Sequence, residues 1–108
     1  MRATRSLLQN ALRLTMFSRP NCSLCDEAKV VVRKVTGNNP AEYKEYDVMN
    51  AGNERWKDLY EFDTPVVHID QMGSLPNGET TAQAKKLMHR FTEAQLQAAM
   101  DAVTHEAK

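Results

Sequence analysis

Apolar and polar residues alternate near the start of the chain, where Leu12, Leu14 and Met16 are separated by single polar residues. A period of two is typical of a β-strand, so this pattern predicts a strand over residues 12–17. The period then lengthens, and apolar residues recur along one face of a predicted helix at Leu24, Ala28, Val31, Val32 and Val35. The sequence Gly-Asn-Asn-Pro at residues 37–40 is expected to end this helix.

The rest of the chain predicts three further strands, over residues 43–48, 65–69 and 84–90. A helix is expected over residues 50–60, with a buried stripe formed by Trp56, Leu59 and Tyr60. Residues 70–83 are rich in glycine and proline and predict a loop that is long for a compact domain.

The last predicted helix begins with Thr92-Glu-Ala-Gln95, which has the form of a capping box. Its buried positions are expected to be Leu96, Ala99, Met100 and Val103. The element order is then β-α-β-α-β-β-α. Strands joined by a crossover helix are parallel, so this order predicts an α/β fold with a four-stranded mixed sheet and helices on both faces.

Composition and charge narrow the classes of function. The chain has 108 residues, enough for one domain with its own core, and 14 basic against 14 acidic side chains. A net charge of zero does not favour nucleic acid or an anionic membrane as a partner, and no apolar run approaches the ~20 residues of a membrane span. Two cysteines do not make a secreted disulfide framework, which favours a reducing compartment.

The first ten residues are interpreted separately from residues 11–108, which are assigned to the domain. Residues 1–17 contain three arginines and no acidic residue, a composition that suits a mitochondrial presequence. A short flexible tail is the alternative for residues 1–10. The expected location is therefore cytoplasmic or mitochondrial.

Both cysteines lie in one short segment, RPNCSLCD at residues 19–26, between the first predicted strand and the first predicted helix. At a helix N-terminus, unpaired backbone N–H groups and the helix dipole stabilise a thiolate. Cys22 is therefore expected to be the nucleophile, with Arg19 adding a nearby positive charge. Cys25, one turn along the helix, would attack the mixed disulfide that Cys22 forms.

Other roles for the cysteine pair stay open at this point. A zinc site within one chain needs four ligands, and the histidines at positions 68, 89 and 105 lack the paired spacing that such sites show. An iron–sulfur cluster or metal ion bridged by cysteines of two subunits is one alternative function. A catalytically idle binding protein with inert thiols is another.

The string Phe17-Ser-Arg-Pro-Asn-Cys-Ser-Leu-Cys25, followed by a helix, resembles the glutaredoxin pattern of basic-Pro-x-Cys-Pro-Tyr-Cys. Thr64-Pro65 resembles the cis-proline segment that faces the cysteine pair in thioredoxin-fold oxidoreductases. More narrowly, the chain looks like small glutaredoxin-like proteins with Cys-x-x-Cys-Asp-Glu-Ala and a late His-Arg. The resemblance covers about residues 11–104 and implies a thioredoxin-like fold and a thiol–disulfide oxidoreductase.

This resemblance implies roles for individual residues. Cys22 matches the family's attacking cysteine and Cys25 the resolving one, while Arg19 matches a basic residue that contacts a glutathione carboxylate. The family uses glutathione as a co-substrate and needs no bound cofactor or metal. A monomer that acts on glutathione and on protein disulfides, without nucleic acid or membrane, is therefore expected.

Further positions match the family's substrate-binding segments. Thr64 and Pro65 match backbone that pairs with a bound peptide as an added strand. Thr92 and Glu93 fall where glutaredoxins hold the γ-glutamyl end of glutathione.

Three features depart from the glutaredoxin pattern. Ser23-Leu24 stands between the cysteines in place of Pro-Tyr, and His89-Arg90 replaces a Gly-Gly pair that lets glutathione approach the backbone. The loop before the last strand is also longer than the family's tight turn. His89 and Arg90 are either solvated strand-end residues or part of the site.

Overall fold

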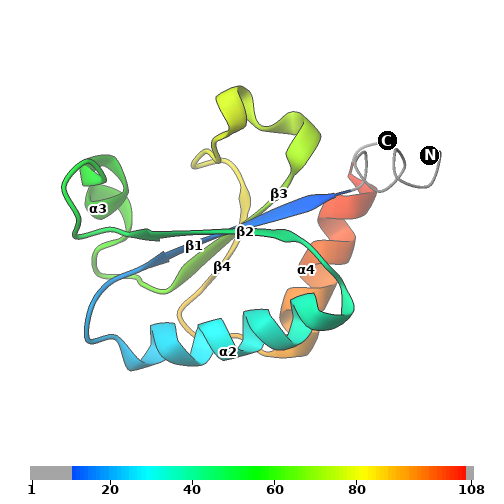
Figure 1. The fold of residues 1–108 in the computed structure, drawn as a ribbon, viewed down its shortest axis with the longest axis horizontal. Helices are drawn as coiled ribbons and strands as arrows, with labels where there is room; N and C mark the ends of the chain where they lie inside the picture. The colour runs from blue at the N-terminus through cyan, green and yellow to red at the C-terminus, as the bar shows by residue number, and fades with distance from the viewer. Residues whose placement is uncertain (1–10, 107–108) are drawn as a thin grey trace.

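A four-stranded mixed β-sheet, in the order β2-β1-β3-β4, forms the centre of the molecule (Figure 1). The computed structural model describes residues 11–106, so both hypotheses for residues 1–10 lie outside the described residues. The strands are β1 (Leu12–Ser18), β2 (Glu42–Asp47), β3 (Val66–Gln71) and β4 (Lys85–Met88). The helices are α2 (Ser23–Asn38), α3 (Glu54–Tyr60) and α4 (Glu93–His105). The predicted element order and fold class are confirmed.

The central strand β1 pairs in parallel with β2 and antiparallel with β3, which is also antiparallel to β4. Its alternating sequence places Leu12, Leu14 and Met16 on one face and Phe17 on the other. Both faces of β1 are covered, which is why even Thr15 is only 1% exposed.

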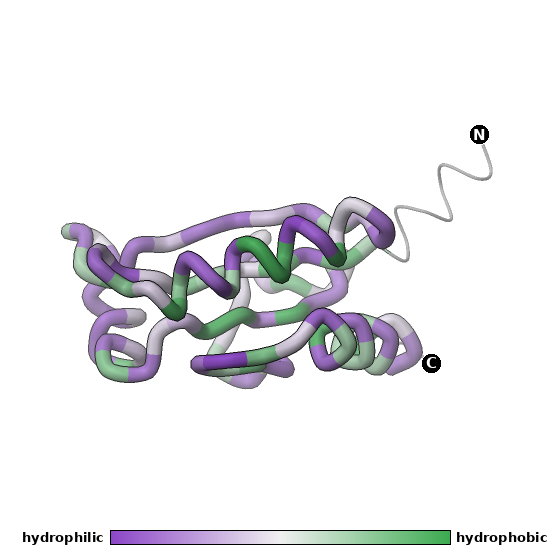
Figure 2. Tube along the Cα trace, turned by 90° about the horizontal axis from the view of Figure 1, so that it is seen from below, coloured by the Kyte–Doolittle hydropathy of each residue, from purple (hydrophilic) through white to green (hydrophobic). Residues whose placement is uncertain are grey.

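The larger core lies between the sheet and helices α2 and α4; in Figure 1, α2 runs below the sheet and α4 rises beside it at the right. Helix α4 turns its predicted apolar stripe toward the strands. In α2 the buried residues are Cys25, Ala28, Val32 and Val35, whereas Leu24 and Val31 of the predicted stripe are only partly buried. Figure 2 shows α2 changing between hydrophobic and hydrophilic residues along its turns. Besides Leu12, Leu14 and Met16 of β1, this core contains Val67, Ile69, Ala28, Val32, Val35, Phe91, Leu96, Ala99, Met100 and Val103. The predicted capping box at Thr92 and Gln95 is present and begins α4.

A smaller aromatic core lies on the opposite face, under α3. Phe17 contacts Trp56 and Tyr60, with ring centroids 4.6 and 5.2 Å away. The prediction that Leu59 is buried with them is wrong, because its side chain is 47% exposed. Trp56 and Tyr60 are four residues apart and lie on the face of α3 that meets the sheet. Successive residues of a helix are about 100° apart around its axis, so the Leu59 side chain points away from Tyr60 and from the sheet.

Most predicted boundaries differ from the structure by a residue or more, and three differ by two residues or more. Helix α3 begins at Glu54 rather than residue 50, because residues 50–53 form turns around Gly52, whose φ is +95°. Strand β3 continues to Gln71, two residues into the predicted loop. Strand β4 covers residues 85–88 rather than 84–90, and His89 has a φ of +64°, a left-handed conformation that cannot continue a strand.

The long β3–β4 connection lies on the same side of the sheet as α3 (Figure 1). It contains two 3-10 turns, Met72–Ser74 and Pro76–Gly78. Its backbone is held to β1 by Arg13, whose Nη1 donates to the Gly78 carbonyl over 2.6 Å. Glu79 accepts a hydrogen bond of 2.7 Å from the Tyr46 hydroxyl of β2. The connection is therefore attached to the sheet and covers the part of this face that α3 leaves open.

A buried chain of hydrogen bonds joins this connection to α3 and β3. Tyr60 Oη lies 2.7 Å from His68 Nε2, His68 Nδ1 lies 2.9 Å from Thr80 Oγ1, and Thr80 donates to Asp70 Oδ2 over 2.6 Å. Because the Thr80 proton goes to Asp70, the Thr80 oxygen accepts from His68 Nδ1–H, and His68 Nε2 accepts from Tyr60. One neutral histidine tautomer thus satisfies every group in the chain.

Burial of His68 makes the stability of this fold dependent on pH. Burial, assisted by the charge of Lys86, lowers the pKa of His68 from 6.5 to about 4. Between these values the unfolded chain binds a proton that the folded protein does not, so acid favours unfolding. As the pH falls from about 7 to about 5, protonation of His68 in the unfolded chain should reduce the free energy of unfolding by roughly 2 kcal/mol.

Urea unfolding of the wild type and of His68→Gln at both pH values measures this effect. The variant should lose that part of the pH dependence. Equal pH dependence in the two proteins would show that His68 is not buried in its neutral form.

Candidate functional site

The cysteine pair lies where β1 ends and α2 begins, at the carboxyl end of the central strand. Asn21 has a φ of +59°, a left-handed conformation that asparagine tolerates, and it turns the chain from the strand toward the helix. Cys22 is the N-cap residue of α2, with extended backbone angles. The predicted strand–helix junction therefore places Cys22 at the positive end of a 16-residue helix.

Cys22 and Cys25 form a disulfide, with their Cα atoms 5.2 Å apart. Cys25 is 1% exposed and packs inward, whereas Cys22 is partly exposed. The backbone N–H of Cys25 donates to Cys22 Sγ over 3.1 Å. Once the disulfide is reduced, a donor at this place stabilises a thiolate at Cys22 more than a thiol.

The segment before β3 forms the opposite wall of the site. The peptide bond between Thr64 and Pro65 is cis, as predicted, and Pro65 is buried. Thr64 Oγ1 lies 3.9 Å from Cys22 Sγ, so its hydroxyl faces the partly exposed sulfur. The structure thus brings four predicted site residues together: Cys22, Cys25, Thr64 and Pro65.

His89 contacts the same segment from the β4–α4 connection. Its backbone N–H donates to the Pro65 carbonyl over 2.8 Å, and its Nε2 lies 3.2 Å from Asp63 Oδ1. His89 therefore holds the residues on both sides of Thr64. Asp63 was not among the predicted site residues, and no spacing signal could identify it because it lies 26 positions before His89.

The other predicted residues surround this centre. Arg19 is exposed in the connection between β1 and α2, three residues before Cys22. Arg90 is exposed and, with His89 and Leu24, lines a cavity of about 60 Å³ between α2 and the β4–α4 connection. This volume has room for a small side chain rather than for a complete small-molecule ligand.

Thr92 and Glu93 are at the start of α4, where their side chains already have partners. Thr92 Oγ1 accepts from the Gln95 backbone N–H over 3.1 Å as the helix cap. The Glu93 carboxylate lies 3.9 Å from Lys34 Nζ of α2. A ligand held by these two side chains would have to share or replace these interactions.

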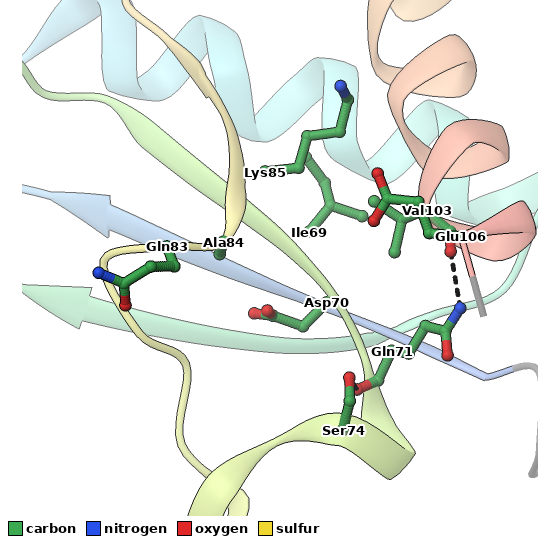
Figure 3. A pocket seen from close by; sticks show the side chains of 9 residues that line it. All are labelled: Ile69, Asp70, Gln71, Ser74, Gln83, Ala84, Lys85, Val103 and Glu106. Atoms are coloured by element: carbon green, nitrogen blue, oxygen red, sulfur yellow. Dashed lines mark hydrogen bonds between the residues drawn. The ribbon is translucent and has the colours of Figure 1, made fainter. Parts of the chain in front are cut away.

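A second cavity, of about 260 Å³, lies at the other end of the sheet (Figure 3). It is lined by the end of β3, the start of β4 and the last turn of α4, including Asp70, Lys85 and Glu106. The hydrogen bond from Gln71 Nε2 to the Val103 carbonyl, 2.7 Å long, borders it. Because residues 69–71 pair with the first residues of β1, this cavity is distant from the cysteines.

Within residues 11–106, no group of three or more His, Cys, Asp or Glu side chains could hold a metal ion. Over the same range, no helix has both the length and the apolar character required to cross a bilayer.

Sequence comparison identifies relatives of the chain. A profile of the glutaredoxin-like domain (DUF836) matches residues 13–101. A curated glutaredoxin-like protein from Dictyostelium discoideum is 31% identical over 65 residues. That match covers 56% of this chain and 60% of the relative, so the chain spans about three fifths of the relative's length.

Solved structures show the same fold. A structural-genomics target from X. campestris has a TM-score of 0.59 and 19% identity, over 82% of this chain and 96% of that one. A thioredoxin variant from Halobacterium salinarum has a TM-score of 0.62 and 16% identity, over 97% of this chain and 86% of that one. At such low identity the likeness concerns the fold alone, and the expected thioredoxin-like fold is confirmed.

The unequal burial of the two sulfurs predicts unequal reactivity. In the reduced protein, a limiting amount of iodoacetamide at mildly acidic pH should label Cys22 first, because Cys22 is accessible and lies at the helix N-terminus. Peptide mapping by mass spectrometry measures the ratio of the two adducts. In the matched Cys22→Ser variant, the remaining Cys25 should react slowly, and equal labelling of both cysteines in the wild type would contradict the assigned roles.

Proposed function

This chain belongs to the glutaredoxin-like (DUF836) family, and we propose that it is a thiol–disulfide oxidoreductase using Cys22 and Cys25 as a dithiol pair. The observation that supports this most strongly is the arrangement of the two sulfurs. One cysteine is partly exposed at a helix N-terminus, and the other is buried one turn along at disulfide distance. An exposed nucleophile with an adjacent buried partner is suited to two successive exchange steps.

In the first step, the Cys22 thiolate attacks one sulfur of a substrate disulfide. A bond forms between Cys22 and that sulfur, and the other substrate sulfur leaves as a thiolate. In the second step, the Cys25 thiolate attacks Cys22, which forms the Cys22–Cys25 disulfide and releases the second substrate thiolate. Two electrons pass from the dithiol to the substrate, and an external thiol must then reduce the protein again.

The residues around Cys22 would favour these steps. The Cys25 N–H and the Thr64 hydroxyl are both placed to donate to a thiolate at Cys22 Sγ. The backbone at Thr64 and Pro65 would pair with an extended substrate segment as an added strand. A substrate sulfur would then be held close to Cys22.

Glutathione is the thiol that we propose as the reductant. Arg19 would supply a cation for one glutathione carboxylate, and the N-terminus of α4 at Thr92 and Glu93 would lie near the other. His89 keeps the left-handed backbone of a glycine while adding a side chain, which is turned toward Asp63. We therefore expect glutathione binding that is weaker than in a glutaredoxin with Gly-Gly at this place.

Substitution of each cysteine separates the two steps. Cys22→Ser should abolish reduction of mixed disulfides, because no other thiol lies at the helix N-terminus. Cys25→Ser should retain some activity in excess glutathione, because a second glutathione can replace the resolving thiol. The assay follows turnover of bis(2-hydroxyethyl) disulfide with glutathione and glutathione reductase. Full activity of Cys22→Ser would refute the proposal.

The role of Arg19 is tested by glutathione affinity. In a Cys22→Ser background, which binds without reacting, Arg19→Ala should weaken glutathione binding at least tenfold. The lost charge-assisted hydrogen bond has a value of ~1.5–3 kcal/mol. Titration calorimetry measures the affinity, with Arg33→Ala, an exposed cation within α2, as the matched control. If neither the parent nor the variants bind glutathione, another thiol or a protein dithiol is the reductant.

A further inference from the structure

Two exposed apolar side chains lie just before the segment that faces Cys22. Phe62 is 84% exposed and Leu59 is 47% exposed, the two largest values among the large hydrophobic side chains of residues 11–106. The backbone bonds Glu61 N to Lys57 O and Asp63 N to Tyr60 O, both 2.9 Å, extend the helical turn past the end of α3. Leu59 and Phe62 are three positions apart in this turn and so project on the same side.

The position of this apolar pair distinguishes it from scattered surface residues, which are ordinary in proteins. Phe62 is two residues before Thr64, so their Cα atoms are at most about 7 Å apart. Thr64 Oγ1 is in turn 3.9 Å from Cys22 Sγ. Asp63, the residue between Phe62 and Thr64, directs its carboxylate toward His89. The backbone that carries the apolar pair therefore leads directly into the segment that faces Cys22.

We propose that Phe62 and Leu59 form a contact surface for protein substrates in which an apolar side chain flanks the disulfide. This inference rests on the proposed oxidoreductase function. An extended segment paired with Thr64 would place residues about two positions from the attacked cysteine near Phe62, given the rise of a strand. An apolar residue there would cover a ring that is otherwise left in water.

The open surface beside Cys22 supports a protein segment as a substrate. Cys22 is partly exposed and does not line the cavity of about 60 Å³ beside His89 and Arg90. An open rim with an exposed phenyl ring instead suits an extended chain. The disulfide of such a segment is reduced by the two exchange steps given above, and the prereduced Cys22–Cys25 dithiol supplies both electrons.

The test compares two cyclic peptides, each with one intramolecular disulfide, that differ only in having Phe or Ser two residues from the cysteines. The prereduced full chain should reduce the Phe peptide about tenfold faster than the Ser peptide in a single turnover. Phe62→Ser should remove this preference, Leu59→Ser should reduce it, and Phe62→Leu should keep most of it. Val30→Ser, which changes a 42% exposed side chain within α2, is the matched control and should have no effect.

Bis(2-hydroxyethyl) disulfide separates substrate recognition from chemistry. The wild type and Phe62→Ser should reduce this small disulfide at the same rate, because it has no apolar flanking residue. Equal rates for the two peptides with the wild type, or a preference that survives in Phe62→Ser, would overturn the inference while the proposed function stands. A dimer in sedimentation that Phe62→Ser dissociates would also overturn it, because the apolar pair would then join two copies of the chain. If the wild type reduces none of the disulfides, the proposed function and this inference both fail.

Discussion

The antiparallel pairing of β1 with β3 is the constraint on which the reactive centre depends. Its register sets Phe17 opposite Val66, so the end of one strand lies beside the start of the other. The residues after β1 include Cys22, and those before β3 are Thr64 and Pro65, so this register brings the two segments together. Slippage by one residue would also move Leu14 and Met16 from the α2–α4 face to the α3 face, which is why the core holds the register.

The two faces of the sheet are stabilised by different means. Helices α2 and α4 cover one face with aliphatic side chains, and this packing fixes the α2 N-terminus at which Cys22 lies. The other face combines the aromatic core under α3 with the β3–β4 connection, which is joined to β3 through His68 and Thr80. A buried polar chain is tolerated here because each of its groups has a hydrogen-bond partner. The connection can therefore cover this face of the sheet without an α-helix.

The rim of the site combines restraint with exposure. His89 holds the segment around Thr64 through one backbone and one side-chain contact, while the adjacent Phe62 extends into solvent. A rigid backbone beside an accessible sulfur favours pairing with an extended chain, since little ordering of the protein is then required. The proposed chemistry thus depends on the helix terminus, and the proposed choice of substrate depends on the side chains that surround it.

The sequence by itself determined the element order, the apolar stripes of α2 and α4, the helix cap at Thr92 and the position of the cysteines at a strand–helix junction. These features depend on local periodicity and on short-range hydrogen bonds, which neighbouring residues specify. Only the tertiary structure decided that Leu59 is exposed, that β4 stops before His89 and that Asp63 joins the site. Those outcomes depend on which side of a short helix meets the sheet, and on contacts between residues such as Asp63 and His89 that are 26 positions apart. No local pattern specifies such contacts, because they form only when the register of the central strands is set.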